Sequence, residues 1–325
     1  GQKLTEQTTP LSQIKYNDNS LSQEFIIQTP TLWSPDMPVL YSAETRLYEG
    51  DQLKDIYTTP FGIRSIEIIP NKGFFLNGEK TVFKGVCNHH DLGPLGASDL
   101  KFRRQIRILK DMGCNAIRTS HNMPAPELVR ACDEMGMMLM AESFDEWNKA
   151  KCANGYNLIF DEWVEKDLVN LVHHYRNNPS VVMWCVGNEV PNQWDESGCK
   201  ISKFLQDICH REDPTRPVTQ GMDAPDAVVN NNMAAVMDVA GFNYRPFRYQ
   251  VNYKKLPQQI ILGSETASTV SSRGVYKFPV ELKAMAVYED HQSSSYDVEH
   301  CNWSNLPEDD FIQHEDLPYC IGEFV

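Results

Sequence analysis

Two glutamates, Glu189 and Glu265, stand where a pair of carboxyl groups could do chemistry. Each directly follows a largely apolar, strand-like run, at residues 181–188 and 260–264. Two carboxyl groups cleave a glycosidic bond when one donates a proton to the departing oxygen and the other, ionised, attacks or stabilises the sugar centre. A glutamate is more often a solvated surface residue, but the position of these two at the ends of apolar runs favours the catalytic interpretation.

Three further polar residues, Arg118, Glu142 and Tyr244, also end strand-like runs. A buried arginine must be paired, so we expect an ionised glutamate beside Arg118, and this pairing would hold the pKa of that glutamate down. Tyr244 could donate its hydroxyl hydrogen to the same carboxylate, or lie at the edge of the core with its hydroxyl in water. Glu142 could position a hydroxyl group or a metal, or simply pair with Arg118.

The cluster of His89, His90, Asp91 and His121 raises the question of a metal site. Adjacent side chains on a strand point to opposite faces, so His89 and His90 are poorly placed to share one ion. We therefore favour the binding of substrate hydroxyl groups by His89, Asp91 and His121 over zinc ligation, and predict no metal site. A packed loop histidine is the plainer alternative for any one of them.

Several tryptophans could stack on the flat face of a sugar ring. Trp147 and Trp194 lie on loops beyond the third and fourth strand-like runs and are the better candidates for such a surface. Trp163 and Trp184 lie inside periodic runs, which indicates core positions.

The elements that must position these residues alternate between strand-like and helical patterns from about residue 80 onward. The strand-like runs are residues 81–88, 116–120, 138–143, 181–188, 217–221, 239–243, 260–265 and 319–325, and helical spacing occupies 101–112, 126–135, 160–175 and 197–211. Alternating strands and helices imply parallel pairing, and eight such units predict an α/β fold of the (β/α)8 (TIM) barrel type. In that fold the carboxyl ends of all strands form one open face, so the polar strand ends should converge there.

The first 69 residues have a different character, with short β-type runs separated by turn signals. This pattern predicts an incomplete immunoglobulin-like β-sandwich at residues 1–69, since such domains usually take about 100 residues. The barrel would then occupy residues 70–325. Because the chain begins with Gly1 and its last strand-like run ends at Val325, we expect a piece of a longer protein with a truncated last strand.

Composition excludes several other classes of protein. Hydrophobic residues make up 41% of the 325 residues, which is core-forming composition, and the net charge of −14 disfavours a nucleic-acid partner. The apolar runs all fall short of the roughly 18 residues that span a bilayer, so no membrane partner is expected. Nine cysteines without a Cys-x-x-Cys pair indicate free thiols rather than a disulfide framework or a zinc ribbon.

Five segments of the sequence resemble glycoside hydrolase family 2, and in particular its bacterial β-galactosidases of the Bacteroides type. Four of them contain the strand ends discussed above, and the fifth precedes the barrel. GVCNHHD at 85–91 and NAIRTSHN at 115–122 resemble the first two barrel strands of that family. WCVGNE at 184–189 is similar to its acid/base segment and GSETAS at 263–268 to its nucleophile segment. FGIR at 61–64 resembles the hinge between its immunoglobulin-like domain and its barrel.

The resemblance implies a retaining exo-β-glycosidase acting on terminal β-D-galactosides, with Glu189 as acid/base and Glu265 as nucleophile. Asn188 would contact the sugar 2-hydroxyl, Tyr244 and Arg118 would orient Glu265, and His89, Asp91 and His121 would line the sugar subsite. No cofactor is required, although Mg²⁺ or Na⁺ is compatible with a longer parent enzyme. The binding partner would be an oligosaccharide or glycoside substrate. The resemblance is compatible with a homo-oligomer, and its bacterial members imply a location in the cytoplasm or periplasm.

Other readings stay open at this point. The same fold and mechanism could act on another sugar, as in a β-glucuronidase, a β-mannosidase or an arabinosidase. The family's N-terminal jelly-roll domain and the aromatic-rich continuation of its last strand do not match any part of this sequence, so a sugar-binding fragment without turnover is a further alternative. A metal-dependent hydrolase is the remaining rival.

Overall fold

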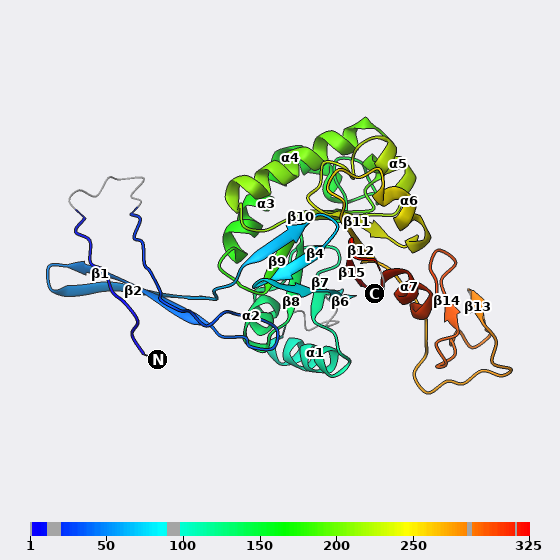
Figure 1. The fold of residues 1–325 in the computed structure, drawn as a ribbon, viewed down its shortest axis with the longest axis horizontal. Helices are drawn as coiled ribbons and strands as arrows, with labels where there is room; N and C mark the ends of the chain where they lie inside the picture. Colours follow the sequence, from blue (N-terminus) through cyan, green and yellow to red (C-terminus); the bar gives the residue numbers. More distant parts are fainter. Residues whose placement is uncertain (1, 12–20, 90–97, 285–287, 316) are drawn as a thin grey trace.

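The computed structural model describes residues 2–11, 21–89, 98–284, 288–315 and 317–325. Eight parallel strands close into a barrel in the order β10-β11-β12-β15-β6-β7-β8-β9, which confirms the predicted (β/α)8 fold (Figure 1). The strands are β6 (Phe83–Cys87), β7 (Ala116–Arg118), β8 (Met138–Glu142), β9 (Val181–Asn188), β10 (Val218–Met222), β11 (Ala240–Asn243), β12 (Ile261–Glu265) and β15 (Cys320–Phe324).

Helices surround the barrel wherever the sequence places apolar residues at helical spacing. They are α1 (Asp99–Asp111), α2 (Pro126–Met135), α3 (Phe160–Tyr175), α4 (Glu196–Glu212), α5 (Pro225–Asn230), α6 (Tyr249–Tyr253) and α7 (Pro307–Glu315), with short 3₁₀ turns η2 (Tyr156–Leu158), η3 (Pro191–Trp194) and η4 (Pro246–Arg248). The four predicted helices correspond to α1–α4. The short α5 and α6 carry too few turns to give a clear periodic signal. Within the described residues, no helix has both the length and the apolar character needed to cross a bilayer.

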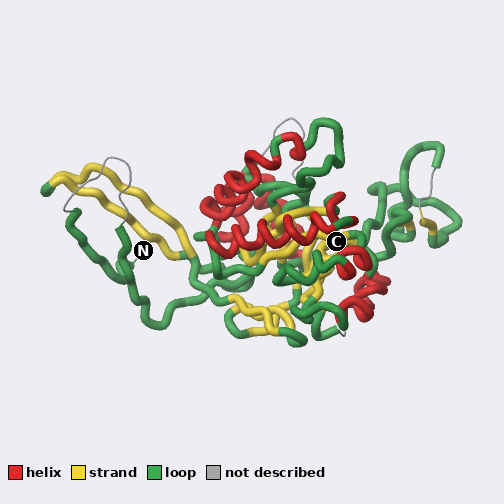
Figure 2. The backbone as a smooth tube through the Cα atoms, turned by 90° about the horizontal axis from the view of Figure 1, so that it is seen from above, coloured by secondary structure: helices red, strands yellow, loops and turns green. Residues whose placement is uncertain are grey.

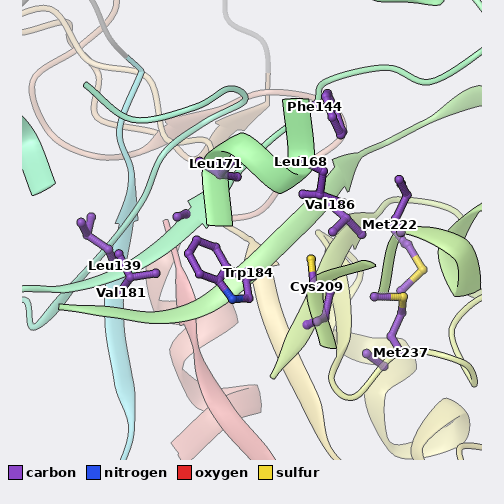
Figure 3. Packing of buried hydrophobic residues seen from close by; sticks show 14 of the residues in the cluster. Leu139, Phe144, Leu168, Leu171, Val181, Trp184, Val186, Cys209, Met222 and Met237 are labelled. Carbon is purple, nitrogen blue, oxygen red and sulfur yellow. The ribbon is translucent and has the colours of Figure 1, made fainter. Parts of the chain in front are cut away.

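The strands bury side chains on both of their faces, as expected for a parallel sheet covered by helices. All eight residues of β9 are buried. Trp184 and Val186 pack outward with helix residues, whereas Val182 and Cys185 belong to the cluster inside the barrel. Figure 3 shows Trp184 at the centre of the outer layer, among residues from β8, α3 and α4.

The amino end of the barrel is closed by a small antiparallel sheet of β3 (Ile66–Ile69), β4 (Gly73–Leu76) and β5 (Glu79–Thr81). Phe74 of this sheet packs on Phe83 with ring centroids 4.7 Å apart, and Phe83 packs on Phe324 at 5.7 Å. Burying each such ring stabilises the fold by roughly 1.5–3 kcal/mol. The polar strand ends therefore gather at the opposite, carboxyl end of the barrel.

The residues before the barrel include an antiparallel ribbon of β1 (Tyr41–Glu49) and β2 (Gln52–Phe61), which extends away from the barrel (Figures 1 and 2). Nearly all of its residues are exposed. The strand-like run at residues 24–28 is not a strand, and no second sheet packs on the ribbon within the described part of residues 1–65. The immunoglobulin-like sandwich therefore stays a prediction, and β3 pairs with β4 across the predicted boundary at residue 70.

A long excursion, residues 266–319, separates the last two barrel strands. It contains the two-residue strands β13 (Lys283–Ala284) and β14 (Glu299–His300) and the helix α7, and forms a lobe beside the barrel in Figures 1 and 2. After it, β15 pairs with β12 on one side and with β6 on the other, so its five residues close the barrel.

Replacement of Gly322, on β15, tests how closely the barrel closes on β6. Gly322 has φ +113°, and a Cβ at this position would lie 2.2 Å from the Phe83 carbonyl oxygen. We expect Gly322→Ala to lower the free energy of unfolding by about 3 kcal/mol or more, since it combines backbone strain with a backbone clash. Urea unfolding followed by tryptophan fluorescence measures this loss.

Gly113→Ala is the matched control. Gly113 also has a positive φ, +90°, but a Cβ there would meet no atom within 4 Å. Its cost should be only about 1 kcal/mol of backbone strain. Equal losses in the two variants would show that barrel closure does not depend on the close approach at Gly322.

Candidate active site

The guanidinium group of Arg118, at the end of β7, lies at the centre of the polar strand ends and is fully buried. An arginine side chain carries five N–H donors in a planar fork. Nε donates to Glu142 Oε2 at 2.6 Å and Nη2 to Glu142 Oε1 at 3.1 Å. Nη2 also donates to Asn188 Oδ1 at 2.8 Å, and Nη1 donates to the Ser264 carbonyl oxygen at 2.8 Å and to Glu265 Oε2 at 3.1 Å. Every donor of Arg118 thus has a partner.

Glu142, at the end of β8, neutralises this buried cation and is itself fully buried. The predicted pairing of Glu142 with Arg118 is confirmed by the bidentate contact. Burial alone would lower the pKa of Arg118, but the negative charge of Glu142, aided by that of Glu265, raises it well above its ordinary value. Glu142 Oε1 also lies 3.1 Å from His121 Nδ1, so both carboxylate oxygens are occupied by protein donors.

Glu265, at the end of β12, is surrounded by hydrogen-bond donors. Its Oε1 accepts from the Tyr244 hydroxyl at 2.5 Å and its Oε2 from Arg118, as the sequence predicted, and His121 Nε2 lies 3.4 Å from Oε2. Burial and the charge of Glu265 raise the pKa of Tyr244, so the phenol keeps the hydrogen that it donates. Hydrogen bonds to an ionised carboxylate stabilise its charged form.

Glu189, just beyond the end of β9, lies in a different environment. Its backbone has φ +42° and its N–H donates to the Gly221 carbonyl oxygen at 2.8 Å. Burial raises the pKa of Glu189, the hydrogen bond from Asn243 opposes this, and the negative charges of Asp223 and Glu265 raise it further. The environment therefore favours the protonated form of Glu189 relative to an ordinary glutamate.

Two asparagines join the environments of the two glutamates. Asn243 Nδ2 donates to Glu189 Oε1 at 2.8 Å and to Asn188 Oδ1 at 2.9 Å, and Asn243 stands opposite Glu265 in the register of β11 and β12. Asn188 Oδ1 also accepts from Arg118, which in turn contacts Glu265. The structure thus brings Glu189 and Glu265 into one hydrogen-bonded network at the carboxyl end of the barrel.

Sequence reasoning missed Asn243 as a member of the site. The signal was present, because Asn243 directly precedes Tyr244 at a strand end in the same way that Asn188 precedes Glu189. It also missed Gly221, where a Cβ would lie 2.7 Å from Arg118 Nη2, 2.7 Å from Asn243 Oδ1 and 2.9 Å from Asn188 Oδ1. Only a residue without a side chain leaves room for this network.

A charged pair supports Asn188 from the outer side and was not predicted either. Asn188 Nδ2 donates to Asp145 Oδ1 at 3.1 Å. Lys151 Nζ donates to the same Asp145 oxygen at 2.8 Å and to the Asn188 carbonyl oxygen at 3.1 Å. Although burial acts to raise the pKa of Asp145, the contact with Lys151 lowers it below its ordinary value.

The predicted sugar-lining residues divide into three cases. His121 touches both Glu142 and Glu265, as described above. The ring of His89 is exposed and lies perpendicular to that of His121, with centroids 5.2 Å apart. Asp91 lies outside the described residues. Their role in substrate binding stays a prediction.

The prediction that Trp147 offers an open face for stacking is wrong. Its side chain is fully buried, its indole N–H donates to the Val186 carbonyl oxygen at 2.8 Å, and it packs against Gly187. Trp147 therefore packs against the backbone of β9 at Val186 and Gly187. Trp194, on η3, is 69% exposed, so this second tryptophan is available at the surface. The core position predicted for Trp184 is confirmed, whereas that for Trp163 is wrong, since Trp163 is 42% exposed on α3.

Two of the four residues that raised the question of a metal, His90 and Asp91, lie outside the described residues. Within the described ranges, no group of three or more His, Cys, Asp and Glu side chains is arranged to hold an ion. Both oxygens of Glu142 are engaged by Arg118 and His121.

The fold and the site together define a (β/α)8-barrel protein with two unlike strand-end glutamates at the carboxyl face. A family model described as "Glycosyl hydrolases family 2, TIM barrel domain" matches residues 67–312, and one described as "Glycosyl hydrolases family 2" matches residues 1–64. The chain belongs to glycoside hydrolase family 2.

Individual relatives agree with this assignment. The chain is 35% identical to the β-galactosidase BoGH2A of Bacteroides ovatus over 94% of its own length and 40% of that protein. It is 30% identical to a β-glucuronidase of Bacteroides fragilis over 60% of its length and 28% of that protein. The crystal structure of a β-glycosidase from Bacteroides vulgatus superposes with a TM-score of 0.78 at 33% identity, covering 92% of this chain and 41% of that one. The chain thus spans less than half the length of these relatives.

The contact from Asn243 predicts how the titration of Glu189 responds to substitution. The hydrogen bond from Asn243 Nδ2 favours the ionised form of Glu189, so Asn243→Ala should move the pKa of Glu189 to a still higher value. Carbon-13 NMR of labelled glutamate carboxyl groups follows the titration, and Glu189→Gln assigns the signal.

Ser264→Ala is the control for that experiment. It removes the hydroxyl that donates to Asn243 Oδ1 at 2.8 Å but keeps the amide that faces Glu189. A smaller upward movement than in Asn243→Ala is expected. An unchanged or lowered midpoint in Asn243→Ala would contradict the assignment of that hydrogen bond.

Proposed function

We propose that this chain carries the catalytic barrel of a retaining exo-β-glycosidase that hydrolyses terminal β-D-galactosides. The observation that carries the proposal is the contrast between the two glutamates. Glu265 is held by Arg118 and Tyr244, with His121 beside it, which favours a charged nucleophile. Burial raises the pKa of Glu189, which favours a proton donor. Glycoside hydrolysis by double displacement needs this division between two carboxyl groups.

In the first step, the ionised carboxylate of Glu265 attacks the anomeric carbon and forms a glycosyl ester. The electron pair of the breaking C–O bond passes to the glycosidic oxygen, which takes the proton of Glu189. In the second step, the ionised Glu189 removes a proton from water, the water oxygen attacks the anomeric carbon, and the ester bond to Glu265 breaks. Two inversions at the same carbon give net retention.

Other members of the network would bind the sugar or prepare the two glutamates. The side-chain amide of Asn188 has two N–H groups, of which one is used by Asp145, so the other can donate to the sugar 2-hydroxyl. Hydrogen bonds to that hydroxyl strengthen as charge develops in the transition state. His89 and His121 would bind further hydroxyl groups. The two chemical steps use protein side chains alone and need no cofactor. A structural role for Mg²⁺ or Na⁺ stays a prediction.

The choice of galactose rests on one comparison and one feature of the site. The relative matched over 94% of this chain is named a β-galactosidase. A uronic acid substrate would need a cationic group for its carboxylate. In the network around the two glutamates, Arg118 uses all five donors within the protein and Lys151 contacts Asp145 and the Asn188 carbonyl oxygen.

A β-glucuronidase is the second candidate, because a Bacteroides fragilis relative carries that name. A panel of 4-nitrophenyl β-glycosides separates the two candidates, measured on this chain and on any longer chain that contains it. We expect the highest kcat/KM for the galactoside. A higher kcat/KM for the glucuronide, or for a mannoside or arabinoside, would overturn the choice of sugar while leaving the mechanism in place. Binding of galactose without turnover of any member would overturn the assignment of an enzyme.

Substitution of the two glutamates tests the mechanism. Glu265→Gln should abolish turnover of 4-nitrophenyl β-galactoside, because the amide cannot form the ester intermediate. Glu189→Gln should lose about 10²–10⁴-fold in kcat/KM on poor leaving groups and far less on activated ones, which need little proton donation. Proton NMR of the first-formed product should show the β-anomer.

Glu162→Gln serves as the control, since Glu162 lies exposed on α3, outside the barrel, and should leave turnover unchanged. Wild-type activity in Glu265→Gln would remove that residue from its role. A loss in Glu189→Gln that is independent of the leaving group would remove Glu189 as the acid. An initial α-anomer would exclude retention.

A further inference from the structure

One segment of the long excursion returns to the residues that directly follow the nucleophile position. His300 forms an antiparallel bridge with Thr269, and the Cys301 N–H donates to the Ser268 carbonyl oxygen at 3.1 Å. The Ser268 N–H donates to Ser304 Oγ at 2.6 Å, and Ser304 Oγ donates to the Thr266 carbonyl oxygen at 3.2 Å. Residues 300–304 are therefore fixed against the stretch of chain that begins just after Glu265.

The same segment is also fixed to the loop after β11. The Trp303 carbonyl oxygen accepts from Arg245 Nη1 at 2.7 Å. Arg245 directly follows Tyr244, whose hydroxyl binds Glu265 and lies 3.5 Å from Ser268 Oγ. The Trp303 backbone is thus bonded to the loop after β11, and its neighbours Cys301 and Ser304 are bonded to the chain after β12. The segment therefore lies beside both strand ends that present the groups around Glu265.

Trp303 keeps a large apolar ring in water at this anchored position. Its side chain is 47% exposed, whereas Trp33, Trp147 and Trp184 are fully buried. No aromatic ring or cation stacks on the Trp303 indole within the described part of the chain. A tryptophan that serves only to hold the excursion against the barrel would gain free energy from burial. An anchored backbone with an open indole face leaves a large flat apolar surface available to a ligand.

We propose that Trp303 forms the wall of a sugar-binding subsite beyond the scissile bond, where its indole stacks on the pyranose ring of the leaving group. This inference rests on the proposed function and specifies its substrate class as β-linked oligosaccharides rather than simple glycosides. The terminal sugar must lie against the carboxylate of Glu265. In the part of the chain that the structure describes, Trp303 is connected to Glu265 through Arg245 and the adjacent Tyr244. We therefore place its indole one layer further out, along the path of the next ring.

The chemistry of stacking defines the expected behaviour. A pyranose presents C–H groups on its faces, and a tryptophan ring offers the largest flat apolar surface among the side chains. The contact is made before the bond breaks and persists in the transition state, so it contributes uniform binding. Its loss should therefore raise KM for substrates with a sugar leaving group and leave kcat nearly unchanged.

The test compares two substrates in one variant. For Trp303→Ala we expect kcat/KM on a β-galactosyl disaccharide to fall about tenfold through KM, as the loss of one aromatic contact implies. On 2,2,2-trifluoroethyl β-galactoside, whose leaving group has no ring, kcat/KM should stay within about twofold. Trp303→Phe should recover part of the loss.

Trp163→Ala is the matched control, because Trp163 is 42% exposed on α3, away from the site, and should change neither substrate. Equal losses on both substrates in Trp303→Ala would show that Trp303 acts through the position of Glu265, and no loss on either would show that the face serves another partner. Each result overturns the proposal.

A binding measurement separates this inference from the proposed function. Saturation-transfer NMR reports contact between the protein and the disaccharide without any turnover. If the wild type cleaves no glycoside, the proposed function fails. The subsite would still be established by magnetisation transfer to the second sugar ring, provided that this transfer is lost in Trp303→Ala and kept in Trp163→Ala. Transfer that is unchanged in Trp303→Ala would refute the subsite whatever the activity.

Discussion

The site depends on one constraint, which is that a guanidinium buried inside the barrel must satisfy all of its donors. Arg118 does so by contacting three other strands, through Glu142 on β8, Asn188 on β9, and Ser264 and Glu265 on β12. Leaving a buried charge unpaired costs about 3–5 kcal/mol, so the contacts hold these strand ends in register. The register in turn determines where Glu265 stands.

The same constraint makes the two candidate glutamates unlike each other. Glu142 accepts from Nε and Nη2 of Arg118, whereas Glu265 accepts from Nη1 and from the Tyr244 hydroxyl. Among the described contacts, Glu189 is linked to that cation through the neutral amides of Asn188 and Asn243, and burial is the largest influence on its pKa. Two carboxyl groups in unlike environments thus share one network, which is the division of roles that the proposed function uses.

Local pattern and distant packing explain where prediction from sequence worked and where it did not. The barrel strands and α1–α4 were predictable because continuous apolar runs and apolar spacing of period 3.6 are local properties of the sequence. Trp147 was misplaced because its loop position says nothing about Gly187, against which it packs. Asn243 was overlooked because its importance comes from Glu189, a residue on another strand. The role proposed for Trp303 depends on contacts of its segment with Arg245 and with the residues after Glu265. A local sequence pattern cannot predict such contacts.

The sequence by itself determined the parallel barrel, the order of its strands along the chain and the candidate carboxyl groups, because strand ends in a closed parallel sheet can converge only at one face. Tertiary structure alone decided which partner each group has. The pairing of Arg118 with Glu142, the amide bridge through Asn243 and the open face of Trp303 depend on distances between segments far apart in the chain. Hydrogen bonds act over about 3 Å, and only the closed barrel brings those segments that near.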